Sequence, residues 1–167
     1  RYATKTTELR EYFSEFALIR YRVKIEIAYL LALAELKLGG FPILSIGEIA
    51  LINSIIENFT VKDALRIKEI EKTTNHDVKA VEYFIREELK DKISNTILPF
   101  VHFALTSQDI NNTAVPLSLK EALEISISPA INELLKRLDE KSKEWYEIPM
   151  LARTHGQAAS PTGVGKE

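Results

Sequence analysis

Cysteine is absent from this sequence of 167 residues, and its absence excludes several kinds of site. Without a thiol the chain has no disulfide, no thiolate nucleophile and no metal centre ligated by cysteine. Such a composition is compatible with a reducing compartment, and it leaves histidine, carboxylate and hydroxyl side chains as the candidates for chemistry.

Long apolar runs and a large excess of charge are also missing. No apolar stretch approaches the roughly 20 residues that span a bilayer, and no signal peptide is visible. The 22 basic and 24 acidic side chains give a net charge of −2, which favours neither nucleic acid nor a membrane surface as a partner. We therefore expect a cytoplasmic protein.

Apolar residues, by contrast, are plentiful and have helical spacing. They make up 46% of the chain, against 28% charged residues, as in a folded globular protein. From Thr7 to Leu38 they recur every three or four residues, which predicts one long helix ended by Gly39 and Gly40. Helices are also predicted over 46–58 and from Thr60 onward. No segment alternates with a period of two, so we predict an all-α fold without a sheet of consequence.

The helical pattern breaks and resumes at three further places. It stops at Thr73 and resumes at Val78, so Asn75 or Asp77 is the predicted N-cap. A short apolar helix is predicted around Pro99. The next helix is predicted to be capped by Ser107 and to bend near Pro129, followed by a polar turn at 151–157.

Both ends of the sequence indicate a longer protein. The chain begins at Arg1 rather than Met. Near its other end, Ser160 or Thr162 as a cap and Pro161 at a helix entrance predict the start of a helix that the sequence does not contain. We expect the chain to be the amino-terminal portion of a larger protein.

The chain's three histidines each stand in or near a cluster of polar residues at a predicted helix end. His76 lies between Asn75 and Asp77, which could set its tautomer and raise its pKa, although a solvated loop histidine has the same appearance. His102, between Val101 and Phe103, is interpreted as a packed histidine with an internal hydrogen bond.

The other polar positions also have two interpretations. His155 precedes Gly156, where a permissive backbone can approach a ligand, but one loop histidine is a weak signal. Thr106 and Ser107 open a helix whose free N–H groups can seat a carboxylate or phosphate, and ordinary capping is the alternative. The histidines are not spaced as metal ligands, and no complete nucleotide-binding glycine loop is present, so we predict neither a metal nor a cofactor.

Taken together, four segments resemble the adenylosuccinate lyase family in order, type and spacing. They are Arg1–Tyr2, Ile70–Phe84, Val101–Asn112 and Arg153–Gln157. The resemblance extends along essentially the whole chain. The run Thr-Thr-Asn-His-Asp-Val-Lys-Ala is specific to one branch of this family, whereas Thr-Ser-x-Asp and Thr-His-x-Gln are shared with the wider fumarase and aspartase superfamily.

The resemblance implies an enzyme that cleaves a carbon–nitrogen bond by β-elimination. It would release fumarate from adenylosuccinate to leave AMP, and act likewise on the succinylated imidazole carboxamide nucleotide of purine synthesis. It also implies an all-α fold with an amino-terminal helical domain over 1–105 and the start of a central helical bundle over 106–167. The assembly implied is a homotetramer in which three subunits build each active site. The family's catalytic serine base lies on a later loop, so this chain alone is expected to be inactive.

By the same resemblance, His155 is the general acid, with Thr154 beside it. Asn75, His76 and Asp77 contact the nucleotide and a carboxylate and also orient this acid.

Further substrate contacts follow from the resemblance. Thr106 and Ser107 donate to the succinyl carboxylates, while Arg1 and Tyr2 hold the 5′-phosphate. Lys79 and Gln157 are further members of the pocket. Departures from the family pattern are Gln108 for glutamate, Ala158 for proline and Gly163 for threonine, and none of these bears an acid–base role.

Two other interpretations remain open at this point. One is another lyase of the superfamily, such as argininosuccinate lyase, but a free amino-acid substrate has no phosphate that needs Arg1. The other is a non-catalytic helical oligomerisation module, since long amphipathic helices with capped ends are common scaffolds. Under that interpretation the three polar clusters need not converge.

Overall fold

The structure of the chain is a computed structural model that describes residues 2, 4–36 and 40–167. The chain forms two compact units, one ending at Ala122 and the other spanning Leu123–Glu167. Helices dominate and only one small sheet, of two strands, occurs among the described residues, so the predicted all-α class is confirmed. The division lies within the segment 106–167, and the predicted domain boundary at 105/106 stays a prediction.

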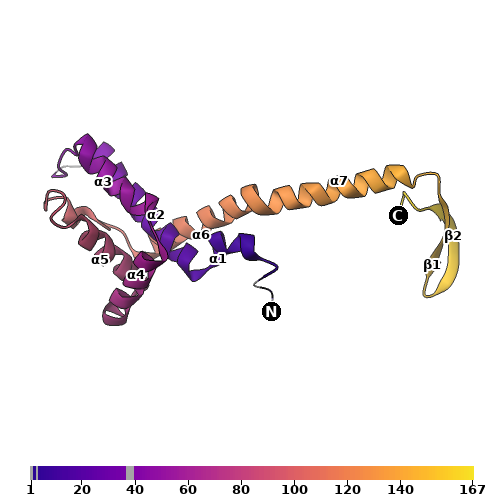
Figure 1. Ribbon diagram of the computed structural model, residues 1–167, viewed down its shortest axis with the longest axis horizontal. Coiled ribbons are helices and arrows are strands. Elements are labelled where there is room, and N and C mark those ends of the chain that lie inside the picture. Colours follow the sequence, from indigo (N-terminus) through magenta and orange to yellow (C-terminus); the bar gives the residue numbers. More distant parts are fainter. Residues whose placement is uncertain (1, 3, 37–39) are drawn as a thin grey trace. The chain divides into compact units, whose positions relative to one another are not determined.

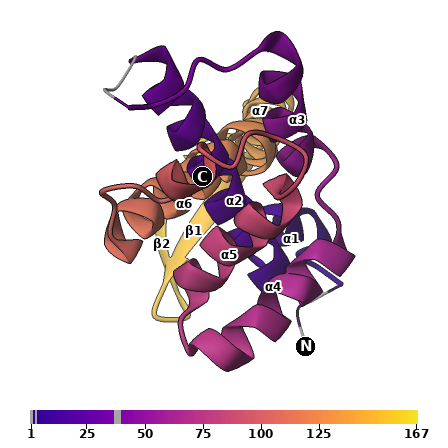
Figure 2. The ribbon, with the colours of Figure 1, turned by 90° about the vertical axis from the view of Figure 1, so that its left-hand side faces the viewer.

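The first unit is a set of helices packed around one long central helix, α2 (Figures 1 and 2). Helix α2 contacts α3, α4, α5 and α6. Val23, Ile27 and Leu30 of α2 are buried in the main apolar core together with residues of the surrounding helices. The elements of this unit are η1 (Thr7–Leu9), α1 (Arg10–Phe13), α2 (Glu15–Glu35), α3 (Ile46–Glu57), α4 (Val61–Thr74), α5 (Asp77–Leu89), η2 (Leu98–Phe100) and α6 (Ser107–Ala122).

The prediction of one uninterrupted helix from Thr7 is wrong, because the chain breaks at Ser14. Ser14 has an extended backbone, with φ −80° and ψ 164°, and its hydroxyl accepts a hydrogen bond from the N–H of Ala17. Serine competes with helical hydrogen bonding in this way and so starts a new helix. Helix α2 ends at Glu35, and the predicted cap at Gly39 lies outside the described residues.

Reciprocal capping boxes set the starts of α3 and α4; the sequence predicts the start of α4 at Thr60, whereas the box at the start of α3 is seen only in the structure. Ser45 and Glu48 form one, and Thr60 and Asp63 form the other. In each, the acidic side chain accepts from the backbone N–H of the capping residue, which satisfies a donor that the first helical turn leaves free.

The second unit contains η3 (Leu123–Ile127), α7 (Ser128–Glu144), β1 (Pro149–Thr154) and β2 (Gln157–Gly163). The stretch η3 is π-helical and directly precedes Ser128 and Pro129, close to where a bend is predicted. Pro129 has no N–H with which to continue the normal helical ladder, so an irregular stretch at this place has a physical cause.

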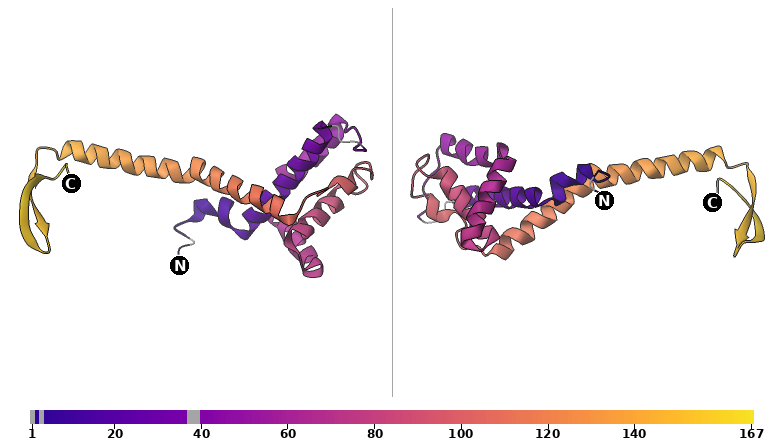
Figure 3. Two further views of the ribbon diagram at one scale, coloured as in Figure 1. Left: turned by 180° about the vertical axis from the view of Figure 1, so that it is seen from behind. Right: turned by 60° about the horizontal axis from the view of Figure 1, so that its bottom comes forward.

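The strands β1 and β2 form an antiparallel hairpin after α7, which the sequence patterns do not predict (Figure 3). Thr154 pairs with Gln157 at the turn and Pro149 with Gly163 at the far end, with a register shift between Leu151 and Arg153. The expected helix start at 160–163 is therefore wrong, since these residues belong to β2. Proline is tolerated in such a strand because a two-stranded ribbon has only edge strands.

After the hairpin the chain returns to the end of α7. The N–H of Val164 donates to the carbonyl of Ile148, and the N–H of Gly165 donates to the carbonyl of Trp145. Position 165 has to be glycine, since a Cβ there would lie 2.2 Å from the backbone oxygen of Ser142. In the part of the chain that the structure describes, no helix is both long and apolar enough to cross a membrane.

Candidate functional site

The starts of α5 and α6, which hold two of the three predicted polar clusters, are joined by Arg22 of α2. Its Nη2 lies 2.7 Å from Asp77 Oδ2, and its Nε donates to Asn111 Oδ1 over 2.9 Å. Asp77 is the first residue of α5, and Asn111 lies near the start of α6. Within the first unit the fold therefore brings the segment containing His76 close to the segment that begins at Thr106.

His76 is the N-cap of α5, a place that the sequence assigns to Asn75 or Asp77. Its Nδ1 accepts a hydrogen bond of 3.1 Å from the backbone N–H of Lys79. This bond fixes the tautomer: Nδ1 is an acceptor and Nε2 carries the proton of the neutral ring. The tautomer of His76 is thus set by a backbone amide and not, as predicted, by its neighbours Asn75 and Asp77. Asn75 instead ends α4 with a left-handed backbone, φ 49°.

Asp77 uses both carboxylate oxygens within the chain. One accepts from the N–H of Val78, and the other pairs with Arg22. Burial acts to raise the pKa of Asp77, but these two partners outweigh it, and the pKa lies below its ordinary value. The carboxyl group is therefore ionised near neutral pH and carries a fixed negative charge at the start of α5.

The ammonium group of Lys79 is directed to a buried acid. Its Nζ lies 2.7 Å from Oε2 of Glu82 and 5.2 Å from the centre of the Tyr83 ring. Arg86 binds the other oxygen of Glu82 at 2.8 Å, so this nearly fully buried carboxylate is held between two cations. The assignment of Lys79 to the substrate pocket stays a prediction.

Thr106 and Ser107 have different roles at the start of α6: Thr106 binds Asp109, whereas Ser107 has a free hydroxyl among the described residues. Thr106 is the residue before the helix, and its N–H and hydroxyl both donate to Asp109 Oδ2, at 2.7 and 2.9 Å. These bonds lower the pKa of Asp109. Ser107, the predicted cap, is instead the first helical residue, and its hydroxyl makes no hydrogen bond among the described residues. That hydroxyl is therefore a donor available to a bound anion.

His102 is packed and internally hydrogen-bonded, as the sequence predicts. Its Nδ1 lies 2.5 Å from Oε1 of Glu26 on α2, and the two side chains are only 15% and 0% exposed. The backbone of His102 has a positive φ of 61°, as does that of Ala104 at 57°. Both conformations are strained for residues other than glycine. The Glu26 hydrogen bond thus holds a strained turn just before Thr106.

Burial also affects the ionisation of Glu26. Desolvation raises the pKa of Glu26 above its ordinary 4.5 and Glu82 adds to this rise, whereas His102 and Arg86 oppose it without reversing it. Above pH 4.5 the folded chain therefore retains a proton that the unfolded chain has lost, and the free energy of unfolding decreases as pH rises through this window. We expect Glu26→Gln to remove this decrease.

Denaturant unfolding of the wild type and of Glu26→Gln between about pH 4 and about pH 8 checks this expectation. Identical dependence on pH in the two proteins would contradict it. Glu69→Gln is a suitable control, because Glu69 is 62% exposed in its ion pair with Arg66.

The hairpin turn of the second unit presents the third polar cluster. His155 and Gly156 are its two central residues, and both have positive φ, 51° and 75°. This is the pattern of the type I′ turns that suit two-residue hairpins. The side chains of Thr154, His155 and Gln157 are exposed and make no hydrogen bond among the described residues. The predicted permissive backbone is confirmed, and the imidazole is available to a ligand.

The remaining predicted residues lie at the amino terminus. Tyr2 is 65% exposed, and its carbonyl accepts from the N–H groups of Lys5 and Thr6. Arg1 lies outside the described residues, so the predicted phosphate contact of this pair stays a prediction.

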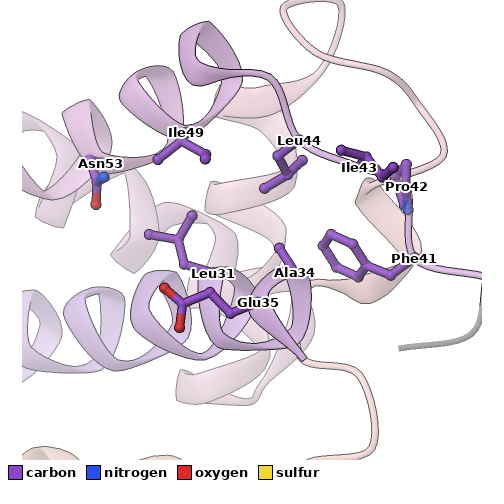
Figure 4. A pocket seen from close by; sticks show the side chains of 9 residues that line it. All are labelled: Leu31, Ala34, Glu35, Phe41, Pro42, Ile43, Leu44, Ile49 and Asn53. Atoms are coloured by element: carbon purple, nitrogen blue, oxygen red, sulfur yellow. The ribbon is translucent and has the colours of Figure 1, made fainter. Parts of the chain in front are cut away.

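A pocket of about 620 Å³ lies elsewhere in the first unit, between the end of α2 and the start of α3 (Figure 4). Its walls are mainly apolar, with Leu31, Phe41, Leu44 and Ile49 among the side chains that Figure 4 shows around it. None of the predicted site residues lines this pocket. It lacks the cluster of donors that a substrate with several negative charges requires.

Arg22 and Glu26 are the two residues at this site that sequence reasoning misses. They are spaced like an exposed helical ion pair, and α2 contains many other charged residues. In the structure both are buried, and each binds a residue distant in sequence. Only the packing of α2 against α5 and α6 distinguishes them from solvated charges.

Comparison with known proteins places this helical chain in the lyase class. The family model described as "Lyase" matches residues 1–167, so the chain belongs to this family. Adenylosuccinate lyase of Dictyostelium discoideum is 48% identical over the whole chain, and that of Vibrio cholerae is 47% identical over the whole chain. The predicted family resemblance is confirmed.

The chain spans only 37% of the length of each of these two relatives. Among solved structures, the β-carboxy-cis,cis-muconate cycloisomerase of Acinetobacter calcoaceticus superposes with a TM-score of 0.76 at 22% identity. That comparison covers 98% of this chain and 37% of the cycloisomerase, and at this identity it shows a common fold.

Proposed function

We propose that this chain is part of an adenylosuccinate lyase, which releases fumarate from adenylosuccinate and from the succinylated imidazole carboxamide nucleotide. The observation that carries the proposal is the joining of the starts of α5 and α6 through Arg22. Two adjacent helix N-termini can bind separate anionic groups of one substrate, since each offers N–H groups and a partial positive charge. The curated relatives named above support the choice of substrate.

The proposed reaction is a β-elimination. A base removes a proton from the carbon next to a succinyl carboxylate, and the negative charge that develops is stabilised by fixed donors, among them Thr106 and Ser107. The electrons of this C–H bond form the double bond of fumarate, and those of the C–N bond leave with nitrogen. His155 then supplies the proton that the nitrogen gains, which leaves AMP. The base belongs to the part of the enzyme outside these residues.

The remaining proposed contacts are with the nucleotide, a carboxylate and the phosphate of the substrate. Asn75, His76 and Asp77 bind the nucleotide and a carboxylate and orient the acid, whereas Arg1 and Tyr2 bind the phosphate. Lys79, Thr154 and Gln157 complete the pocket. No cofactor takes part in this mechanism, and the cytoplasmic location stays a prediction.

The proposed assembly is a homotetramer whose active sites take residues from several subunits. Helix α7 supports it, because none of its residues is buried and its large apolar side chains lie along one face. These residues are Ile131, Leu134, Leu135 and Leu138, all more than half exposed. A face of this kind is stable only when another helix covers it.

Fumarate formation by the full-length protein tests the proposed function. We expect fumarate from adenylosuccinate and from the succinylated imidazole carboxamide nucleotide, and none from argininosuccinate. The 167-residue chain alone is the matched control and is expected to form none, because the proposed base belongs to the part of the enzyme outside these residues. Release of fumarate from argininosuccinate only would favour an argininosuccinate lyase. Activity of the short chain would contradict the proposal that the base lies outside these residues.

A further inference from the structure

Arg22 is a buried cation on the central helix α2, and none of the substrate contacts proposed above involves it. Its side chain is only 10% exposed, and α2 contains none of the predicted site residues. A guanidinium group removed from water is costly unless its N–H groups have partners. Its partners therefore indicate what this placement achieves.

The two partners of Arg22 belong to two different helix starts. Asp77 is the first residue of α5, and Asn111 lies near the start of α6. Helix α2 contacts both of these helices, and they also contact each other (Figure 2). A guanidinium group is planar and its N–H groups point in fixed directions. Hydrogen bonds of 2.7 and 2.9 Å from one such group therefore fix the spacing between the two helix starts.

Stability alone is a poor reason for this arrangement. The amino-terminal end of a helix carries a partial positive charge, so a cation beside two such ends is disfavoured. The Asp77 carboxylate offsets this, but its side chain is 45% exposed, so water weakens the attraction, and a buried cation often contributes no more stability than an apolar residue of the same size. What the two hydrogen bonds of Arg22 do supply is a fixed distance between the starts of α5 and α6.

We propose that Arg22 is a positioning residue that sets the distance between the segment Asn75–Asp77 and the segment Thr106–Ser107. It acts through Asp77 and Asn111 rather than by contact with the substrate. The inference rests on the proposed function, in which these segments bind different parts of one molecule. Loss of the fixed spacing would prevent both segments from binding their groups at once, which weakens substrate binding.

Steady-state kinetics of the full-length protein with adenylosuccinate test this inference. For Arg22→Met we expect a KM raised between about tenfold and about a hundredfold, with a smaller change in kcat. Arg22→Lys keeps the charge but has no planar fork, so an intermediate KM is expected. Asn111→Leu, which removes one of the two hydrogen bonds, is also expected to raise KM, and its combination with Arg22→Met should add little further.

Arg66→Met is the matched control. Arg66 also bridges two helices, since its Nη2 lies 3.0 Å from Glu87 of α5, but its side chain is 49% exposed and it touches neither helix start. Its KM is expected to equal that of the wild type. Melting temperatures of all variants separate folding from binding, and Arg22→Lys and Asn111→Leu keep the test informative if Arg22→Met does not fold.

The outcomes distinguish the inference from the proposed function. If the wild-type protein forms no fumarate from either purine substrate, both the proposed function and the positioning role of Arg22 are wrong. If the wild type is active and the folded Arg22 variants have an unchanged KM, only the positioning role is wrong. An equal rise of KM in Arg66→Met also overturns it, because the effect would then be one of general stability.

Discussion

Replacing His155 with alanine in the full-length protein is expected to lower kcat by about 10² to 10⁴, the usual contribution of a positioned general acid. The departing nitrogen needs a proton, and without the imidazole only water can supply it. The imidazole is exposed at the tip of the β1–β2 turn and has no hydrogen bond among the described residues, so its removal leaves no partner unsatisfied. Turnover measured at saturating adenylosuccinate checks this expectation.

Two further variants separate chemistry from folding. His155→Asn is expected to lose as much activity while retaining the turn, since asparagine tolerates the positive φ of 51° at this position. Tyr146→Ala, at a 72% exposed side chain in the same compact unit, is expected to keep wild-type turnover. The oligomer should stay intact in all three proteins by size-exclusion chromatography. Unchanged kcat in His155→Ala would rule out the general-acid role.

Charging the apolar face of α7 is expected to dissociate the proposed tetramer and to abolish activity with it. The change is Leu134→Glu together with Leu138→Glu, at side chains that are 59% and 58% exposed in the isolated chain. Burying one leucine contributes roughly 1.5 to 3 kcal/mol, and burying a carboxylate in its place is strongly unfavourable. An active site built from several subunits would be lost when they separate.

The control for this experiment lies on the opposite face of the same helix. Lys136→Ala with Lys143→Ala changes the net charge by −2, as the double glutamate variant does, but it leaves the apolar face unaltered. Analytical ultracentrifugation and fumarate formation are measured on both. A tetramer that survives Leu134→Glu and Leu138→Glu would show that α7 does not form the subunit interface.

Much of the first unit is predictable from local signals. Helical spacing of apolar residues predicts α3 from Ile46, and the pair Thr60–Asp63 predicts the start of α4, both in agreement with the structure. The break at Ser14 is not predictable in this way, because apolar spacing continues across it and only the extended backbone shows that two helices meet there. Spacing reports which face is apolar, but it does not report whether the helix is continuous.

The hairpin shows a different limit of local reasoning. Residues 149–163 lack the alternation of a half-buried strand, because this ribbon has little core to face and its side chains are mostly exposed. The signal that could have revealed it is His155-Gly156, a pair suited to positive φ at both central positions of a turn. The sequence predicts a polar turn here, but it does not predict the strand on either side of that turn.

What the sequence by itself determined was the family and the identity of the candidate residues. Runs such as Thr73–Ala80 and Arg153–Gln157 carry that information in the order of their side chains. Only the tertiary structure decided the roles of Arg22 and Glu26, the choice of His76 as the cap, and the joining of α5 with α6. The physical reason is that burial and hydrogen bonding link these side chains to partners as many as 89 positions away, and no local pattern records such a distance.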